Sequence, residues 1–144
     1  MADLTIIIVS FNTRAELEAC LGSLVEHELR TSHEIVVVDN ASSDHTPAAL
    51  RERWPGVRLI ECGRNIGFAA ANNLGIRSSS GEFVLLLNSD TLVRPGAIDT
   101  LVEQLRRSPE AAAAGPRPRT TRVPKCFSAI STADSPTITS NVSA

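Results

Sequence analysis

The sequence predicts an α/β protein with a doubly wound, mostly parallel sheet flanked by helices. Two observations lead to this prediction. Continuous apolar runs rich in β-branched residues recur along the chain, as in strands covered on both faces, and helical segments separate them. Clusters of Asp, Asn and Ser also follow these runs. With 144 residues the chain buries one core, so a single folded unit is expected.

The first predicted strand covers residues 4–9, an apolar run containing one Thr. Thr13 and Glu16 then have the spacing of a capping box, which predicts the start of a helix. Apolar positions at helical spacing follow and would form its buried face: Leu17, Cys20, Leu21, Leu24 and Val25.

The same alternation predicts the remaining elements. Strands are expected at residues 34–38, 57–62 and 82–87, and a helix of small residues at 69–77. Thr46 is expected to cap another helix, with Pro47 at its first position. A last helix starts at Pro95, and its expected solvated face consists of Asp99, Glu103, Arg106 and Arg107.

Composition limits the classes of partner. A net charge of -2, a pI near 5.9 and four Phe, one Trp and no Tyr argue against a nucleic-acid-binding surface. No apolar stretch is long enough to span a bilayer, and the first residues lack the pattern of a secretion signal. We therefore expect a cytoplasmic protein that can sit peripherally at the inner face of the membrane.

The composition changes after Pro116. Residues 117–144 contain four basic residues against one acidic residue and are rich in Ser, Thr and Pro. They show no helical or strand periodicity, which predicts a disordered tail after a folded unit of residues 1–116. Two alternatives remain open: a basic arm for an acidic partner, and a tail that is not native to the family.

Polar residues follow each predicted strand at the edge where open α/β sheets bind ligands. These candidates are Ser10 and Asn12, then Asp39 and Asp44, then Arg64, Asn65 and Gly67, and finally Asn88 and Asp90. Each cluster alone is also good turn chemistry. Asn72, a poor helix former inside a predicted helix, either faces a ligand or lies in solvent.

Two common phosphate-binding patterns are absent. The sequence contains no GxxxxGK[ST] loop, and no GxGxxG follows the first strand. A nucleotide held by this fold would therefore need carboxylates and a divalent ion rather than a glycine-rich cradle. Mg²⁺ or Mn²⁺ suits such oxygen ligands.

Four linked motifs, in residues 5–12, 35–46, 65–75 and 85–90, resemble those of family 2 glycosyltransferases of the GT-A fold. The pattern is similar to the bacterial rhamnosyltransferase-like branch, which makes cell-surface polysaccharide. The resemblance covers the N-terminal, donor-binding part of the family. It implies an inverting transfer of a sugar from a UDP- or dTDP-linked donor to a hydroxyl of a glycan or lipid-linked acceptor.

The resemblance also implies site roles. The strand end from Val9 to Asn12, including Ser10, would line the nucleobase pocket, and Asp39 would accept a hydrogen bond from the base. Asp90 matches the last Asp of the family's DxD motif, which binds Mg²⁺ or Mn²⁺ on the diphosphate. The nucleoside and donor sugar would lie beside Asp44 and the segment from Asn65 to Asn73, which includes Gly67 and Asn72. Asn88 is a further candidate for donor binding.

The sequence departs from the family pattern at two places. Asn88 replaces the first Asp of DxD. The family's general base and acceptor site follow the position of Pro116, and nothing in residues 117–144 matches them, so no catalytic residue is assigned and Asp134 is not taken as the base. An inactive nucleotide-sugar-binding fragment is therefore the alternative to an active enzyme. A nucleotidyltransferase is less favoured, because the expected glycine-rich basic loop is absent.

Overall fold

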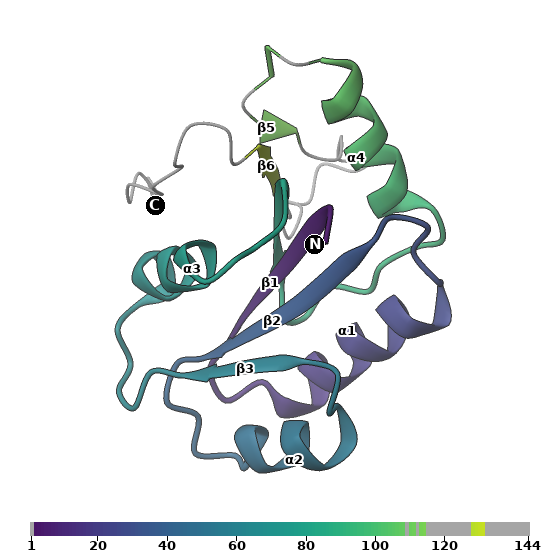
Figure 1. The fold of residues 1–144 in the computed structure, drawn as a ribbon. Coiled ribbons are helices and arrows are strands. Elements are labelled where there is room, and N and C mark those ends of the chain that lie inside the picture. Colours follow the sequence, from purple (N-terminus) through teal and green to yellow (C-terminus); the bar gives the residue numbers. More distant parts are fainter. Residues whose placement is uncertain (1, 109, 112, 115–127, 132–144) are drawn as a thin grey trace, which may run out of the picture.

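The computed structural model describes residues 2–108, 110–111, 113–114 and 128–131. Their strands form one six-stranded sheet in the order β3-β2-β1-β4-β6-β5 (Figure 1). The first four strands pair in parallel, and β6 pairs antiparallel with both β4 and β5. The predicted doubly wound, mostly parallel sheet is confirmed.

Strands and helices alternate as expected from β1 to α4, and two strands, β5 and β6, follow. The strands are β1 (Leu4–Ser10), β2 (His33–Asp39), β3 (Arg58–Glu61), β4 (Phe83–Asn88), β5 (Ala113–Ala114) and β6 (Ser128–Ser131). The helices are α1 (Arg14–Glu26), α2 (Thr46–Arg53), α3 (Phe68–Arg77) and α4 (Ala97–Arg107). Among the described residues, none of the helices is both long and apolar enough to cross a membrane.

Helices cover both faces of the sheet, which explains why the central strands are apolar on both sides. Ile6 and Ile8 of β1 pack with α1, α2 and α4 in the larger buried cluster. Ile7 and Val9 pack with α3 in the smaller cluster on the opposite face. Residues 4–10 are therefore all buried, whichever face they point to.

The small residues of α3 allow it to lie close to the sheet. A Cβ atom placed on Gly75 would come within 2.6 Å of Ile7 Cγ2 and 3.3 Å of Val38 Cγ2. The last turn of this helix therefore packs closely against β1 and β2. Its first residue, Phe68, lies at the pocket side of the sheet, beside the carboxyl ends of the parallel strands.

The structure differs from the expected capping at two helices. Thr13 is the N-cap residue of α1, but its side chain makes no capping hydrogen bond, because its hydroxyl bonds to Ser10 and Ser89 instead. Thr46 is the first residue of α2 rather than its cap, and His45 occupies the cap position in a left-handed conformation. The expected capping by Thr13 and Thr46 is therefore wrong.

The structure differs from the sequence predictions at two further places, Asp99 and residues 128–131. Asp99, expected in solvent, is 3% exposed and accepts hydrogen bonds from the N–H and hydroxyl of Thr31 and from the N–H of Arg30. Residues 128–131 form β6 within the segment that showed no strand periodicity. The rest of residues 117–144, including Asp134, lies outside the described residues.

Candidate functional site

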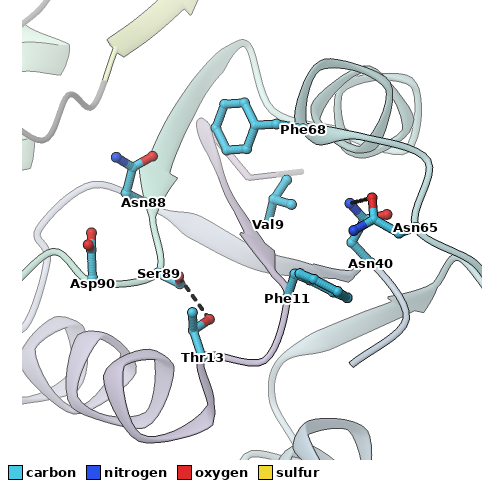
Figure 2. Close-up of a pocket in the computed structure, with 9 residues that line it drawn as sticks. All are labelled: Val9, Phe11, Thr13, Asn40, Asn65, Phe68, Asn88, Ser89 and Asp90. Carbon is cyan, nitrogen blue, oxygen red and sulfur yellow. Dashed lines mark hydrogen bonds between the residues drawn. The ribbon is translucent and has the colours of Figure 1, made fainter. Parts of the chain in front are cut away.

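A pocket of about 410 Å³ lies at the carboxyl edge of the parallel strands. It opens between the ends of β1 and β4 and the start of α3 (Figure 2). Nine residues line it: Val9, Phe11, Thr13, Asn40, Asn65, Phe68, Asn88, Ser89 and Asp90. Since these residues come from four separate connections, the parallel topology is what brings them together.

Four of the residues expected from the sequence line this pocket: Val9, Asn65, Asn88 and Asp90. Phe11 and Phe68 also line it, and they lie within segments 9–12 and 65–73, which the family resemblance assigned to the donor site. The sequence did not predict three others: Thr13, Asn40 and Ser89. Phe11 and Phe68 are 46% and 58% exposed, and large apolar side chains are unusual at such exposure. Two of the four Phe in the chain therefore present their rings at one site, a signal hidden by the low aromatic content.

Asn40 forms hydrogen bonds with the loop after β3, which forms one wall of the pocket. Its Nδ2 donates to Asn65 Oδ1 at 3.0 Å, and its Oδ1 accepts from the N–H of Ile66 at 2.8 Å. Asn65 Oδ1 also accepts from the N–H of Gly67 at 2.9 Å. Asn40 is 3% exposed. Its uncharged hydrogen bonds with Asn65 and Ile66, which we call the Asn40–Asn65 clasp, hold the start of α3 against the end of β2.

Asp39 is the last residue of β2 and is 2% exposed. Its Oδ2 accepts the N–H of Ser42 at 3.0 Å, whereas its buried Oδ1 has no hydrogen-bond partner among the described residues. An unpaired buried carboxylate oxygen is costly, so a further hydrogen-bond donor at Asp39 Oδ1 would be stabilising. Nearby Cys62 has its pKa raised by burial and by the charge of Asp39.

Asn12 and Asp44 lie beside the pocket, where they join two loops. Asn12 Oδ1 accepts the N–H of Ser43 at 2.7 Å, and Asp44 Oδ2 accepts the N–H of Arg14 at 2.9 Å. Burial alone would raise the pKa of Asp44, but hydrogen bonds from Thr46 and backbone N–H groups outweigh it and lower the pKa. Both residues line a neighbouring hollow rather than the pocket itself.

Ser10, Gly67 and Asn72 surround the pocket without lining it. Ser10 is buried at the end of β1, and Gly67 precedes α3 with a φ of 84°, a conformation that favours glycine. Asn72 is 2% exposed and donates from Nδ2 to the carbonyl of Phe68 at 3.0 Å. In this structure Asn72 thus bonds within α3, and its predicted contact with a ligand stays a prediction.

Residues with strained backbone angles lie at the same carboxyl edge of the sheet. Among the described residues, three that are not glycine have positive φ: Asn12 at 53°, Ala41 at 70° and His45 at 63°. All three lie in the connections after β1 and β2. Non-glycine residues in this region are strained, and such strain concentrates at binding sites.

The turn after β4 carries the only acidic side chain among the nine pocket residues. Asp90 is exposed, Asn88 and Ser89 are half-buried, and all three point toward the pocket side of the turn (Figure 2). Beneath the turn, Cys20 Sγ donates to the carbonyl of Asn88 at 3.8 Å. Burial and the Asp90 charge raise the pKa of Cys20 to about 12, so this thiol stays neutral.

The described residues contain no cluster of three or more His, Cys, Asp or Glu side chains that could hold a metal ion. The pocket offers one carboxylate, the Asn88 amide oxygen and the Ser89 hydroxyl. A structural metal would need more protein ligands. Mg²⁺ or Mn²⁺ bound jointly by Asp90, water and the phosphates of a ligand fits this sparse oxygen set.

Comparison with known proteins decides the family. The model of Glycosyl transferase family 2 matches residues 5–129. The chain belongs to this family. The match continues past residue 116, where the sequence predicted the end of the folded unit, and it includes Ser128 and Ala129 of β6. The family resemblance of the four motifs is thereby confirmed.

Two curated relatives have names that refer to glycan synthesis. An N-acetylglucosaminyl-diphospho-decaprenol L-rhamnosyltransferase of Mycobacterium tuberculosis is 35% identical over 126 residues, covering 78% of this chain and 40% of the relative. The succinoglycan biosynthesis protein ExoO of Rhizobium meliloti is 35% identical over 103 residues, covering 71% of this chain and 29% of the relative. This chain therefore spans less than half the length of these relatives.

Solved structures agree with the fold. The mannosyltransferase PcManGT from Pyrobaculum calidifontis, in complex with GDP-Man and Mn²⁺, superposes with a TM-score of 0.78 at 26% identity. The superposition covers 90% of this chain and 44% of the mannosyltransferase chain. TarS of Staphylococcus aureus in complex with UDP-GlcNAc has a TM-score of 0.70 at 20% identity. The superposition covers 85% of this chain and 37% of TarS, and it shows that the two share a fold.

Proposed function

We propose that this chain forms the donor-binding part of a glycosyltransferase that moves a sugar from a nucleoside diphosphate to an acceptor hydroxyl with inversion. The pocket at the carboxyl edge carries this proposal, because its single carboxylate, Asp90, lies opposite a neutral amide and aromatic wall. Membership of family 2 supports the reaction class. The named activities of the relatives support a role in cell-surface polysaccharide synthesis, with a glycan or lipid-linked acceptor.

The two sides of the pocket suggest how a donor would be oriented. Asp39 precedes the lining residue Asn40, and its Oδ1 has no hydrogen-bond partner among the described residues; it would accept a hydrogen bond from the base. Val9 and Phe11 provide the apolar surface there, and the Asn40–Asn65 clasp fixes the wall. Asn12, Asp44, Gly67 and Asn72 would hold the loops that shape this wall, with Ser10 beneath them.

Asp90 and Asn88 would hold the diphosphate end of the donor together with Mg²⁺ or Mn²⁺. When bound, this ion offsets charge that develops on the leaving diphosphate. Asn88 contributes a neutral oxygen where a second carboxylate would add negative charge beside the phosphates. No described carboxylate is assigned as the general base, so the chemistry derived from this chain concerns donor binding. We propose that it acts on the cytoplasmic side, at the membrane surface where lipid-linked acceptors would be met.

Calorimetric titration of the 144-residue chain with UDP-, dTDP- and GDP-sugars, with and without Mn²⁺, tests this function. We expect one donor class to bind in a Mn²⁺-dependent way. Asp39→Ala and Asp90→Ala should each weaken this binding by about 1.5–3 kcal/mol, because each removes a hydrogen bond or ionic contact to the ligand.

The matched control is Glu52→Ala, which removes an exposed carboxylate from α2 away from the pocket. It should leave donor affinity unchanged, and all three variants should keep a cooperative unfolding transition. Undiminished donor binding in both Asp39→Ala and Asp90→Ala would refute the assignment of this pocket.

A further inference from the structure

Three hydroxyl groups form a continuous chain from the buried end of β1 to the pocket. Ser10 Oγ lies 3.1 Å from Thr13 Oγ1, and Thr13 Oγ1 donates to Ser89 Oγ at 3.0 Å (Figure 2). Thr13 and Ser89 line the pocket, whereas Ser10 is 0% exposed. We call Ser10, Thr13 and Ser89 the hydroxyl chain.

Burial sets the direction of this chain. Each hydroxyl has one hydrogen, so Thr13, which donates to Ser89, must accept from Ser10. The reverse direction would leave the hydrogen of the buried Ser10 without an acceptor among the residues that the structure describes, which is costly. The hydrogen that remains available therefore belongs to Ser89, at the half-buried end beside the pocket.

Aligned hydroxyl groups polarise one another, so the last donor of the chain is stronger than an isolated Ser. Ser89 stands between Asn88 and Asp90, on the side of the pocket away from Phe11, Asn40 and Asn65 (Figure 2). An anionic oxygen is the best acceptor for such a donor. A diphosphate placed beside Asp90 brings anionic oxygens to this side.

We propose that Ser89 donates a hydrogen bond to the diphosphate of the bound sugar donor and that Thr13 is the residue that orients it. This inference rests on the proposed function of the pocket. It explains why Thr13 sits at the N-cap of α1 and yet does not cap the helix. Its hydroxyl is directed to a residue 76 positions later in the sequence.

The test uses whichever of UDP, dTDP and GDP the wild-type chain binds most tightly with Mn²⁺, compared with the corresponding nucleoside. Ser89→Ala should weaken diphosphate binding roughly ten- to a hundredfold, the value of a hydrogen bond to a charged group, and leave nucleoside binding unchanged. Thr13→Val should weaken diphosphate binding by about three- to tenfold, since Ser89 keeps its hydroxyl but loses its orientation. Thr13→Ser should restore it.

Thr100→Val is the control, because the Thr100 hydroxyl bonds to the Gly96 carbonyl on α4, outside the pocket. It should change neither affinity. Equal losses for nucleoside and diphosphate in Ser89→Ala would place the contact on the ribose or base and overturn the proposal. Unchanged diphosphate binding in Ser89→Ala would overturn it as well. Absence of binding by the folded wild-type chain would instead refute the proposed function, and this inference with it.

Discussion

The two ends of the parallel strands both carry polar networks, but the networks differ in how completely they are satisfied. At the amino end, Glu34 Oε1 accepts hydrogen bonds from the hydroxyls of Thr5 and Ser80 and from the Ser80 N–H, at 2.7–2.9 Å. The hydroxyl of Thr5 in turn accepts the N–H of Gly81 at 3.0 Å. Protein donors fill this network.

Asp99 also forms a filled hydrogen-bond network at the amino end of the strands. Its two carboxylate oxygens accept three hydrogen bonds from Arg30 and Thr31, in the connection that leads into β2. The contact ties the first turn of α4 to the amino edge of the sheet. Packing there is close as well, because a Cβ atom on Gly81 would come within 2.6 Å of the Thr5 nitrogen.

The carboxyl end is built differently. Asp39 Oδ1 lacks a partner among the described residues, the hydroxyl chain presents a hydrogen at Ser89, and two Phe rings are exposed. One edge of the sheet therefore stabilises the fold, whereas the other keeps its polar groups available for a ligand. Stability and binding should therefore respond to different substitutions.

The largest expected effect on stability is at the amino end. Asp99→Ala leaves two backbone N–H groups and a hydroxyl without their acceptor, which should lower the free energy of unfolding by about 2–4 kcal/mol. Urea unfolding measures this change. Glu103→Ala is the matched control on the same helix: its half-exposed ion pair with Arg30 should cost less than about 1 kcal/mol. Equal losses in the two variants would contradict the distinct role of Asp99.

A smaller effect is expected in the pH dependence of stability. Burial alone would raise the pKa of Glu34 and of Asp99, but hydrogen bonds from Thr5 and Ser80 and from Thr31 and Arg30 outweigh it, and both pKa values are lowered. The stabilisation is thus fully present above the ordinary values of 4.5 and 3.8 and is lost as the pH falls through the lowered values.

Urea unfolding between pH 7 and pH 3 measures this loss. The double variant Glu34→Gln, Asp99→Asn should be less stable than wild type at pH 7 and should lose less stability on acidification. Parallel pH profiles for the two proteins would show that these carboxylates do not carry the acid sensitivity.

The sequence predicted what depends on local pattern. The β1 run and the α4 stripe of Ile98, Leu101, Val102 and Leu105 are buried as periodicity required. It did not predict contacts decided by distant partners. Thr13 is a residue type that caps helices, but its hydroxyl donates to Ser89 instead. Asp99 reads as a solvated residue of a helix, but the loop before β2 packs against it and donates hydrogen bonds to it.

The site was predicted to the same extent. The ends of strands pointed to Asn65, Asn88 and Asp90 because parallel topology brings strand ends together, and the family resemblance pointed to the strand end that contains Val9. Phe68 lies within the segment 65–73 to which the family resemblance pointed, but it reads as an ordinary apolar residue until its 58% exposure is known. Asn40 reads as turn chemistry until its clasp with Asn65 is seen.

Amide hydrogen exchange of the full chain, with and without the best-binding nucleoside diphosphate and Mn²⁺, tests the contrast between the two ends most directly. Exchange should slow in the connections after β1, β2, β3 and β4, at residues 11–13, 40–46, 62–67 and 89–91. It should stay unchanged at the amino end, at residues 30–33 and 79–82. Slowing confined to the amino end, or equal slowing at both ends, would contradict the assignment of binding to the carboxyl edge.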